Sequence, residues 1–181
     1  MKELPILFNT EMVKAILAGN KTQTRRLKAG WKVGDLLYVK EAFRYYEDDV
    51  IWDCIQYRAD KAKIKPDFDA DHASCNQAFQ FSARCEEAGI NGKWTPSIHM
   101  PKKFSRIKLR VTEMRTEKLQ EITEDDAEAE GIDFLRHLPD VDETLSPIKL
   151  FCALWLSCAK PGFRWADNPD VIVTKFERVQ A

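Results

Sequence analysis

The stretch that organises the fold is Arg106-Ile107-Lys108-Leu109-Arg110-Val111-Thr112, in which apolar and basic residues alternate. Successive side chains of a strand point to opposite faces of a sheet, so the three apolar residues are predicted to face a core and the basic residues to face solvent. We expect residues 113–119 to prolong this strand past a bend. The chain is therefore predicted to be built around a sheet.

Other segments are predicted to join this sheet or to cover it. Three helices are expected: one at Thr10–Ala18 that stops at Gly19, one that begins with a capping box at Thr123 and stops before Gly131, and one opened by Ser146-Pro147. Further strands are expected at residues 4–8, 36–39, 51–57 and 171–176. Long gaps between strands and clean alternation favour an α+β fold with a mixed, largely antiparallel sheet, curled into a small β-barrel with flanking short helices.

Length and composition indicate one domain with a substantial core. The chain has 181 residues, of which 44% are hydrophobic and 31% are charged. Its net charge is −1 and its pI is about 6.3, whereas a protein that binds polyanions over its whole surface is normally basic. Any nucleic-acid contact is therefore predicted to be local, at residues 21–28 or 102–110.

The cysteines and the N-terminus favour a cytoplasmic protein. The five cysteines form no C-x-x-C pair, and an odd number of them without a signal peptide favours reduced thiols. No apolar run approaches the roughly 20 residues that span a bilayer. We expect no membrane association, no cofactor and no bound metal, and the sequence leaves the oligomeric state open.

The strongest functional signal is Lys21-Thr22-Gln23-Thr24-Arg25-Arg26. It offers three cations and two hydroxyls with no carboxylate between them, which suits an anionic or strongly polar ligand. We expect it to lie on a loop after the first helix, where binding and catalytic groups are often carried. A lysine with a lowered pKa can take the proton of a nearby threonine, so nucleophilic chemistry is possible. The alternative is a solvated, basic strand start.

Glu130 is the second functional signal. As the last residue of its predicted helix it opposes the helix dipole, and a residue that breaks a local preference points to function. We therefore predict a catalytic group of Lys21, Thr24 and Glu130, which requires a turn after Gly19. The alternative is that Glu130 is a frayed surface acid.

The segment from Trp94 to Lys102 is stiffened by two prolines and presents an aromatic ring, a hydroxyl, an imidazole and a thioether. It is predicted to form a wall for a stacked base, and the alternative is a buried connector with a satisfied His99. His72, Cys75, Cys85 and His99 are the candidate ligands for a zinc site. Its spacing is irregular, and no metal site is predicted.

These features together resemble the ASCH family (activating signal cointegrator homology). The resemblance rests on the 21–26 segment, on Val33-Gly34-Asp35-Leu36-Leu37-Tyr38-Val39, on the strand at 106–112, on the acidic helix 119–132 and on the closing strand 171–179. It is greatest to the longer members found in bacteriophages and prophages. It implies a PUA-like barrel, with an insertion here at roughly residues 44–104.

The resemblance also implies an activity. A compact bacterial branch with the same Lys-Thr-x-Thr segment hydrolyses the amide of N4-acetylcytidine. By that resemblance Thr24 is the nucleophile, Lys21 takes its proton and Glu130 manages the proton that goes to the leaving amine. The predicted ligand-binding residues for RNA, a nucleoside or a nucleotide are Thr22, Arg25, Arg26, Trp94, Ser97, His99, Lys102 and Arg106.

Two other functions remain open at this point. One is a non-catalytic RNA- or DNA-binding module, with affinity that falls steeply as salt rises. The other is a phage accessory protein that contacts another protein through the insertion.

Overall fold

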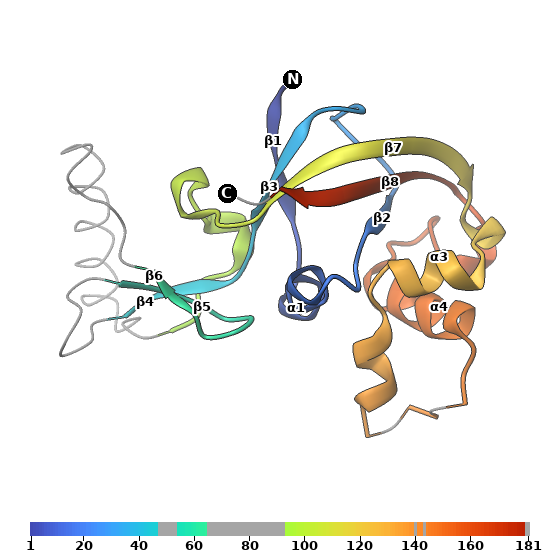
Figure 1. The fold of residues 1–181 in the computed structure, drawn as a ribbon. Coiled ribbons are helices and arrows are strands. Elements are labelled where there is room, and N and C mark those ends of the chain that lie inside the picture. The colour runs from blue at the N-terminus through green and yellow to red at the C-terminus, as the bar shows by residue number, and fades with distance from the viewer. Residues whose placement is uncertain (47–53, 65–92, 140, 143, 180–181) are drawn as a thin grey trace. The chain divides into compact units, whose positions relative to one another are not determined.

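The computed structural model describes residues 1–46, 54–64, 93–139, 141–142 and 144–179 (Figure 1). The chain forms two compact units. The first comprises residues 1–6, 11–39 and 107–181, and the second comprises residues 7–10 and 40–106. The second unit contains the segment 44–104 that the family resemblance marks as an insertion.

A five-stranded sheet organises the first unit, in the order β1-β3-β7-β8-β2. Its longest strands are β7 (Lys108–Lys118) and β8 (Asp170–Val179), which pair antiparallel along their length, as the yellow and red strands of Figure 1 show. A register shift falls between Val111 and Glu113. The predicted strand and its bend are therefore confirmed, and the alternating apolar residues are buried, with Leu109 and Val111 at most 1% exposed.

The sheet is mixed, as predicted. Strand β3 (Leu36–Lys40) pairs antiparallel with β7. Strand β1 (Glu3–Leu7) runs parallel to β3, because the amide of Leu36 donates to Lys2 and the amide of Phe8 donates to Lys40. Among the described residues, the edge strands β1 and β2 are not paired with each other. The α+β class is confirmed at this level.

Strand β2 (Gln23–Arg26) corrects one expectation. The segment was predicted to lie on a loop, but residues 23–26 pair antiparallel with residues 172–175 of β8. The polar sequence shows no apolar alternation, yet its backbone can still complete an open sheet edge. A strand of this composition is stable here because its buried cations find carboxylate partners in the same unit.

The helices begin and end close to where their capping residues predict. Helix α1 spans Thr10–Ala18, and Gly19 follows it with φ +83°. Helix α3 spans Glu124–Ala129, and the hydroxyl of its N-cap Thr123 accepts a hydrogen bond from Asp126 N. Helix α4 spans Pro147–Cys158. Figure 1 shows α3 beside α4. Buried residues from these helices and from neighbouring segments form one core: Leu119, Ile122, Ala127, Ile132, Leu135, Leu150, Phe151 and Val171.

The remaining described elements of the first unit are short 3₁₀ helices. They are η3 (Leu119–Glu121), η4 (Asp133–His137) and η5 (Trp165–Asp167). No helix in the described part of the chain is long and apolar enough to cross a bilayer.

The second unit has its own three-stranded sheet, in the order β4-β5-β6. Strands β4 (Phe43–Tyr46), β5 (Cys54–Tyr57) and β6 (Lys63–Ile64) pair antiparallel in sequence. The predicted strand at 51–57 is present from residue 54, and its first three residues lie outside the described part. Two 3₁₀ turns follow, η1 (Ser97–His99) and η2 (Lys102–Phe104). A separate core is formed by Phe43, Ile55, Tyr57, Met100 and Phe104.

Candidate functional site

Lys21 is positioned by the end of α1 and by the end of α3. The amides of Asn20 and Lys21 both donate to the carbonyl of Ala15, which closes the helix and turns the chain toward β2. Lys21 then forms an isolated bridge with Glu130, and the amide of Thr22 donates to Ala129 O at 3.0 Å. Two segments that are 109 residues apart in sequence thus meet at their backbones.

Glu130 is buried and accepts hydrogen bonds from two cations, so it is not a frayed surface acid. The Lys21 ammonium donates to the Glu130 carbonyl at 2.7 Å and to its carboxylate Oε2 at 3.0 Å, and Arg25 Nη1 donates to Oε1 at 3.1 Å. Lys21, Arg25 and Glu130 are each 4% exposed. The two cations offset the unfavourable position of a carboxylate at a helix C-terminus.

Arg25 joins this pair to two further carboxylates. Its guanidinium donates to Glu117 Oε1, at 3.1 Å from Nε and 2.6 Å from Nη2, and to Asp126 Oδ2 at 2.9 Å. Arg115 donates to the same two carboxylates, at 2.8 Å and 2.6 Å. The Phe151 ring lies 5.7 Å from the Arg25 guanidinium. Arg25 is therefore held by the chain's own acids.

Sequence reasoning missed Glu117 and Asp126 as part of this site. Burial alone would raise the pKa of the Asp126 carboxyl, but the hydrogen bond from Arg25 and the nearby Arg115 outweigh it, and this pKa is lowered. Asp126 was assigned only to a capping box. The available signal was the concentration of acids between residues 117 and 130, opposite the acid-free segment 21–26.

Lys21 has the electrostatic environment of a potential base. Burial lowers the pKa of its ammonium below the ordinary 10.5, because the charged form loses its water. Glu130 opposes this shift, while Arg25 and Arg26 add to it. The net direction is downward, which raises the fraction of neutral amine at any pH below 10.5.

Thr24 is buried on β2, where it pairs with Thr174 of β8. Strand alternation places Thr24 and Arg26 on the face opposite Gln23 and Arg25. Among the described residues, the Thr24 hydroxyl makes no hydrogen bond, whereas the neighbouring Thr174 hydroxyl accepts one from the Trp31 indole at 3.1 Å. The structure thus brings Lys21 and Glu130 together, and in the described part of the chain the Thr24 hydroxyl forms no hydrogen bond with either.

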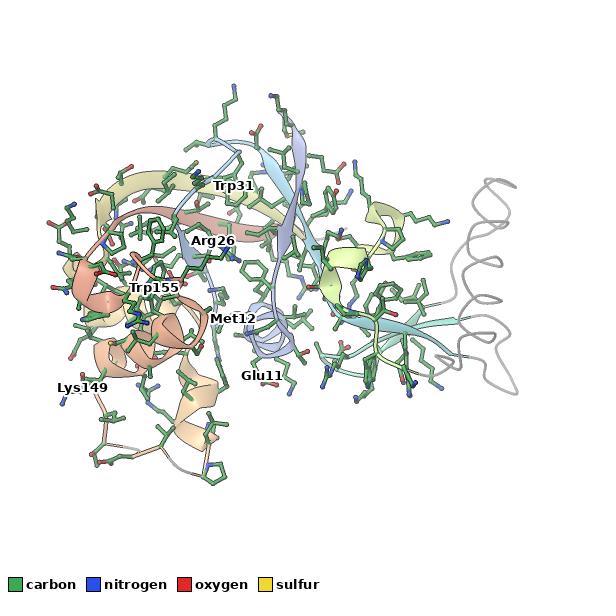
Figure 2. The ribbon with its side chains drawn as sticks, turned by 180° about the vertical axis from the view of Figure 1, so that it is seen from behind. Glu11, Met12, Arg26, Trp31, Lys149 and Trp155 are labelled. Atoms are coloured by element: carbon green, nitrogen blue, oxygen red, sulfur yellow. The ribbon has the colours of Figure 1, made fainter. Side chains whose placement is uncertain are left out.

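Arg26 lies at the edge of the same site. Its pKa is lowered, because burial outweighs the opposing negative charge of the Glu130 carboxylate and, when ionised, of Cys158. Figure 2 shows Arg26 on β2, drawn in that view between the ribbons of α1 and α4. Thr22, the remaining predicted residue of this segment, is exposed, and its carbonyl accepts the amide of Phe176 at 2.9 Å.

The other predicted ligand-binding residues belong to the second unit. Arg106 forms ion pairs with Glu41 and Asp60, each at 2.8 Å, and its guanidinium stacks 4.0 Å from the centre of the Tyr57 ring. His99 and Lys102 are exposed, and Ser97 is half-buried in η1. Trp94 is half-buried beneath cationic side chains.

Metal binding receives no support within the described ranges. No group of three or more His, Cys, Asp or Glu residues there is arranged to hold a metal ion. Of the zinc ligands weighed from the sequence, His72, Cys75 and Cys85 lie outside the described residues.

Comparison with known proteins identifies no relative. No protein-family model, no curated protein and no solved structure matches the chain significantly.

Proposed function

We propose that this chain is an ASCH protein whose Lys21–Glu130 site binds a cytidine base, in RNA or as a nucleoside or nucleotide, and hydrolyses an N4-acyl amide on it. The observation that carries the proposal is the buried Lys21–Glu130 pair, with a lowered Lys21 pKa, beside the buried Thr24. The resemblance of the sequence to the ASCH family further implies that the five-stranded sheet is part of a PUA-like barrel.

The proposed reaction begins at the Thr24 hydroxyl. Neutral Lys21 accepts the hydroxyl proton while Thr24 Oγ1 forms a bond to the amide carbonyl carbon. The tetrahedral intermediate then collapses, the carbon–nitrogen bond breaks, and the exocyclic amine takes a proton that Lys21 and Glu130 deliver. Water hydrolyses the acyl-threonine, which releases the carboxylic acid and restores Thr24.

The carboxylates around Arg25 indicate different roles for Arg25 and Arg26. Because Glu117, Asp126 and Glu130 all bind Arg25, this guanidinium positions Glu130, and Arg26 is the better candidate to contact a ribose or phosphate oxygen. Catalysis also requires the Thr24 hydroxyl to approach Lys21, and catalytic hydrogen bonds often tighten only when substrate binds.

A second candidate function is a non-catalytic module that binds RNA or DNA. It is favoured by one observation, the ion pair between the Lys21 ammonium and Glu130, which gives both side chains a structural role. In such a module the buried network only stabilises the strand edge at β2, and binding is unaffected by Thr24→Ala.

The deciding experiment measures acid release from N4-acetylcytidine by the purified protein. We expect turnover that Thr24→Ala and Lys21→Met each lower by at least about 100-fold, while Thr112→Ala, which alters an exposed threonine of β7 in the same unit, leaves it nearly unchanged. The rate should rise with pH, with a midpoint below 10.5, because burial lowers the pKa of the proposed base. A protein that binds cytidine without any turnover would support the second candidate instead.

A further inference from the structure

Trp31 lies on the segment between β2 and β3, close to the proposed nucleophile. Its indole Nε1 donates a hydrogen bond to Thr174 Oγ1 at 3.1 Å. Thr174 is the cross-strand partner of Thr24 in the antiparallel pair of β2 and β8. Side chains of directly opposite residues emerge on the same face of a sheet, with their Cβ atoms about 4.5–5.5 Å apart. The indole is therefore bound on the face of β2 that carries Thr24.

Arg26 shares this face of the sheet. It follows Thr24 by two residues on β2, so strand alternation directs both side chains to the same side. Arg26 is half-buried, and it is the residue proposed above to contact a ribose or phosphate oxygen. Figure 2 labels the side chains of Arg26 and Trp31. An aromatic ring, the proposed nucleophile and a cation thus gather on one face of two paired strands.

The segment that carries Trp31 is anchored where it leads into β3. The Asp35 carboxylate accepts hydrogen bonds from the amides of Lys2 at 2.7 Å and Lys32 at 3.1 Å. The amide of Val111 donates to Asp35 O at 3.0 Å. Together with the indole hydrogen bond, these contacts hold the ring in one orientation. A ring that is already oriented loses little conformational entropy when a ligand stacks on it.

Trp31 is also the most accessible of the side chains at this point. It is half-buried, whereas Thr174 is 0% exposed and Thr24 is 4% exposed. The hydrogen bond to Thr174 satisfies the single polar atom of the indole, and the rest of the ring system is apolar. The exposed part of Trp31 therefore offers a flat apolar surface to a ligand beside Thr24.

The other described tryptophans are placed differently. Trp155 and Trp165 both pack against Phe151 of the hydrophobic core, with ring centres 6.2 Å and 6.4 Å from it. Trp94, to which the sequence assigned base stacking, belongs to the second unit. Among the tryptophans that the structure describes, only Trp31 donates a hydrogen bond to the strand partner of the proposed nucleophile.

We propose that Trp31 is the platform on which the cytosine base stacks, and that the ligand is therefore an unpaired cytidine. This inference rests on the proposed cytidine-binding function of the Lys21–Glu130 site, and it adds the group that binds the base. Stacking on an aromatic side chain uses the π-face of a base, which a base inside a duplex shares with its neighbours. The site accepts a free nucleoside or nucleotide, or an unstacked residue of single-stranded RNA.

The first test measures the affinity for cytidine by isothermal titration calorimetry. Trp31→Leu should weaken binding by about tenfold, as expected for the loss of one stacked base. Trp31→Phe removes the hydrogen bond to Thr174 but keeps an aromatic face, so it should weaken binding by no more than about threefold. If Trp31 only closed the end of the sheet through that hydrogen bond, the two variants would weaken binding equally.

The second test is spectroscopic. Stacked cytidine should quench part of the fluorescence of the wild-type protein, which has five tryptophans, and Trp31→Phe should abolish this quenching. The matched control is Trp165→Phe, which alters another half-buried tryptophan of the same unit and should leave the quenching in place. Circular dichroism shows whether each variant is folded. The comparison of the two phenylalanine variants decides the proposal even if Trp31→Leu does not fold.

Hydrolysis of N4-acetylcytidine gives a third measurement. Trp31→Leu should raise KM by about tenfold and leave kcat within about threefold, because stacking stabilises bound substrate and transition state alike. A short oligocytidine, titrated like cytidine, shows whether the unpaired base is taken as a nucleoside or within a strand.

Three results would overturn the proposal. They are the absence of cytidine binding by the wild-type protein, unchanged affinity in Trp31→Leu, and equal losses in Trp31→Phe and Trp31→Leu. Cytidine binding that depends on Trp31, without any turnover, would contradict only the proposed hydrolysis. Turnover that is indifferent to Trp31 would contradict only the stacking.

Discussion

At the scale of single residues, the main finding is that the acid-free segment 21–26 binds acids from elsewhere in its own unit. Lys21 and Arg25 are buried, and their charges are compensated by Glu117, Asp126 and Glu130. A buried charge is tolerated only when it is paired and hydrogen-bonded. Within this network Glu130 is the one carboxylate bound to both Lys21 and Arg25.

Removal of Glu130 should therefore be costly. Glu130→Ala leaves the Lys21 ammonium buried without its carboxylate, and we expect the free energy of unfolding to fall by about 3–5 kcal/mol. Glu124→Ala, which removes an exposed acid from the same helix, should cost no more than about 1 kcal/mol. Equilibrium unfolding in urea measures both. If the two variants lose similar stability, the pair does not stabilise the fold in this way.

At the scale of elements, the end of α3 sets the position of Lys21. Gly131 follows the helix with φ +76°, and a Cβ there would lie 2.8 Å from the Cβ atoms of both Ala15 and Lys21. A glycine is required here for two reasons. Its backbone is left-handed, and the end of α3 approaches both Ala15 of α1 and Lys21 closely. The geometry of the Lys21–Glu130 pair thus depends on one residue without a side chain.

Comparison of Gly131 with Gly162 separates the cost of backbone strain from the cost of steric crowding. Gly162 also has a positive φ, +84°, but a Cβ there would meet nothing within 4 Å. Gly162→Ala should cost about 1–3 kcal/mol, from backbone strain alone. Gly131→Ala should cost clearly more by thermal or urea unfolding, and it should also lower any acyl-hydrolase activity through displacement of Lys21. Equal costs at the two positions would show that α3 and Lys21 shift apart freely.

At the scale of the whole molecule, each of the two compact units contains a hydrophobic core among its described residues. The first core contains Leu150 and the second contains Ile55, and each of these side chains is 1% exposed. Separate cores permit separate local unfolding, since regions of a protein open in cooperative units that follow their packing.

Hydrogen exchange can test this division. Leu150→Ala and Ile55→Ala should each cost about 2–5 kcal/mol within the unit that carries the residue. We expect Ile55→Ala to accelerate amide exchange in β4 and β5 while β7 and β8 stay protected, and Leu150→Ala to have the opposite pattern. Uniform loss of protection across both units in either variant would mean that the chain unfolds as a single cooperative body.

Local signals in the sequence were sufficient to locate most elements. The helix at Thr10–Ala18, the Thr123 cap, the proline start of α4 and the bend in β7 all follow from capping chemistry and residue periodicity. These signals depend on neighbours within a few residues. The alternation of the strand 106–112 likewise predicted which side chains are buried.

Only the tertiary structure decided what the polar residues do. Strand β2 forms by hydrogen bonding of its backbone to the edge of β8. Its sequence has no alternating apolar pattern from which a strand could be predicted. Lys21 meets Glu130 across 109 residues, and Trp94 lies beside cations from two other segments, β4 and the β5–β6 turn. Such contacts depend on how the chain path brings distant segments together. Charge pairing acts through space between those segments, so the sequence could predict which residues carry chemistry but not which of them meet.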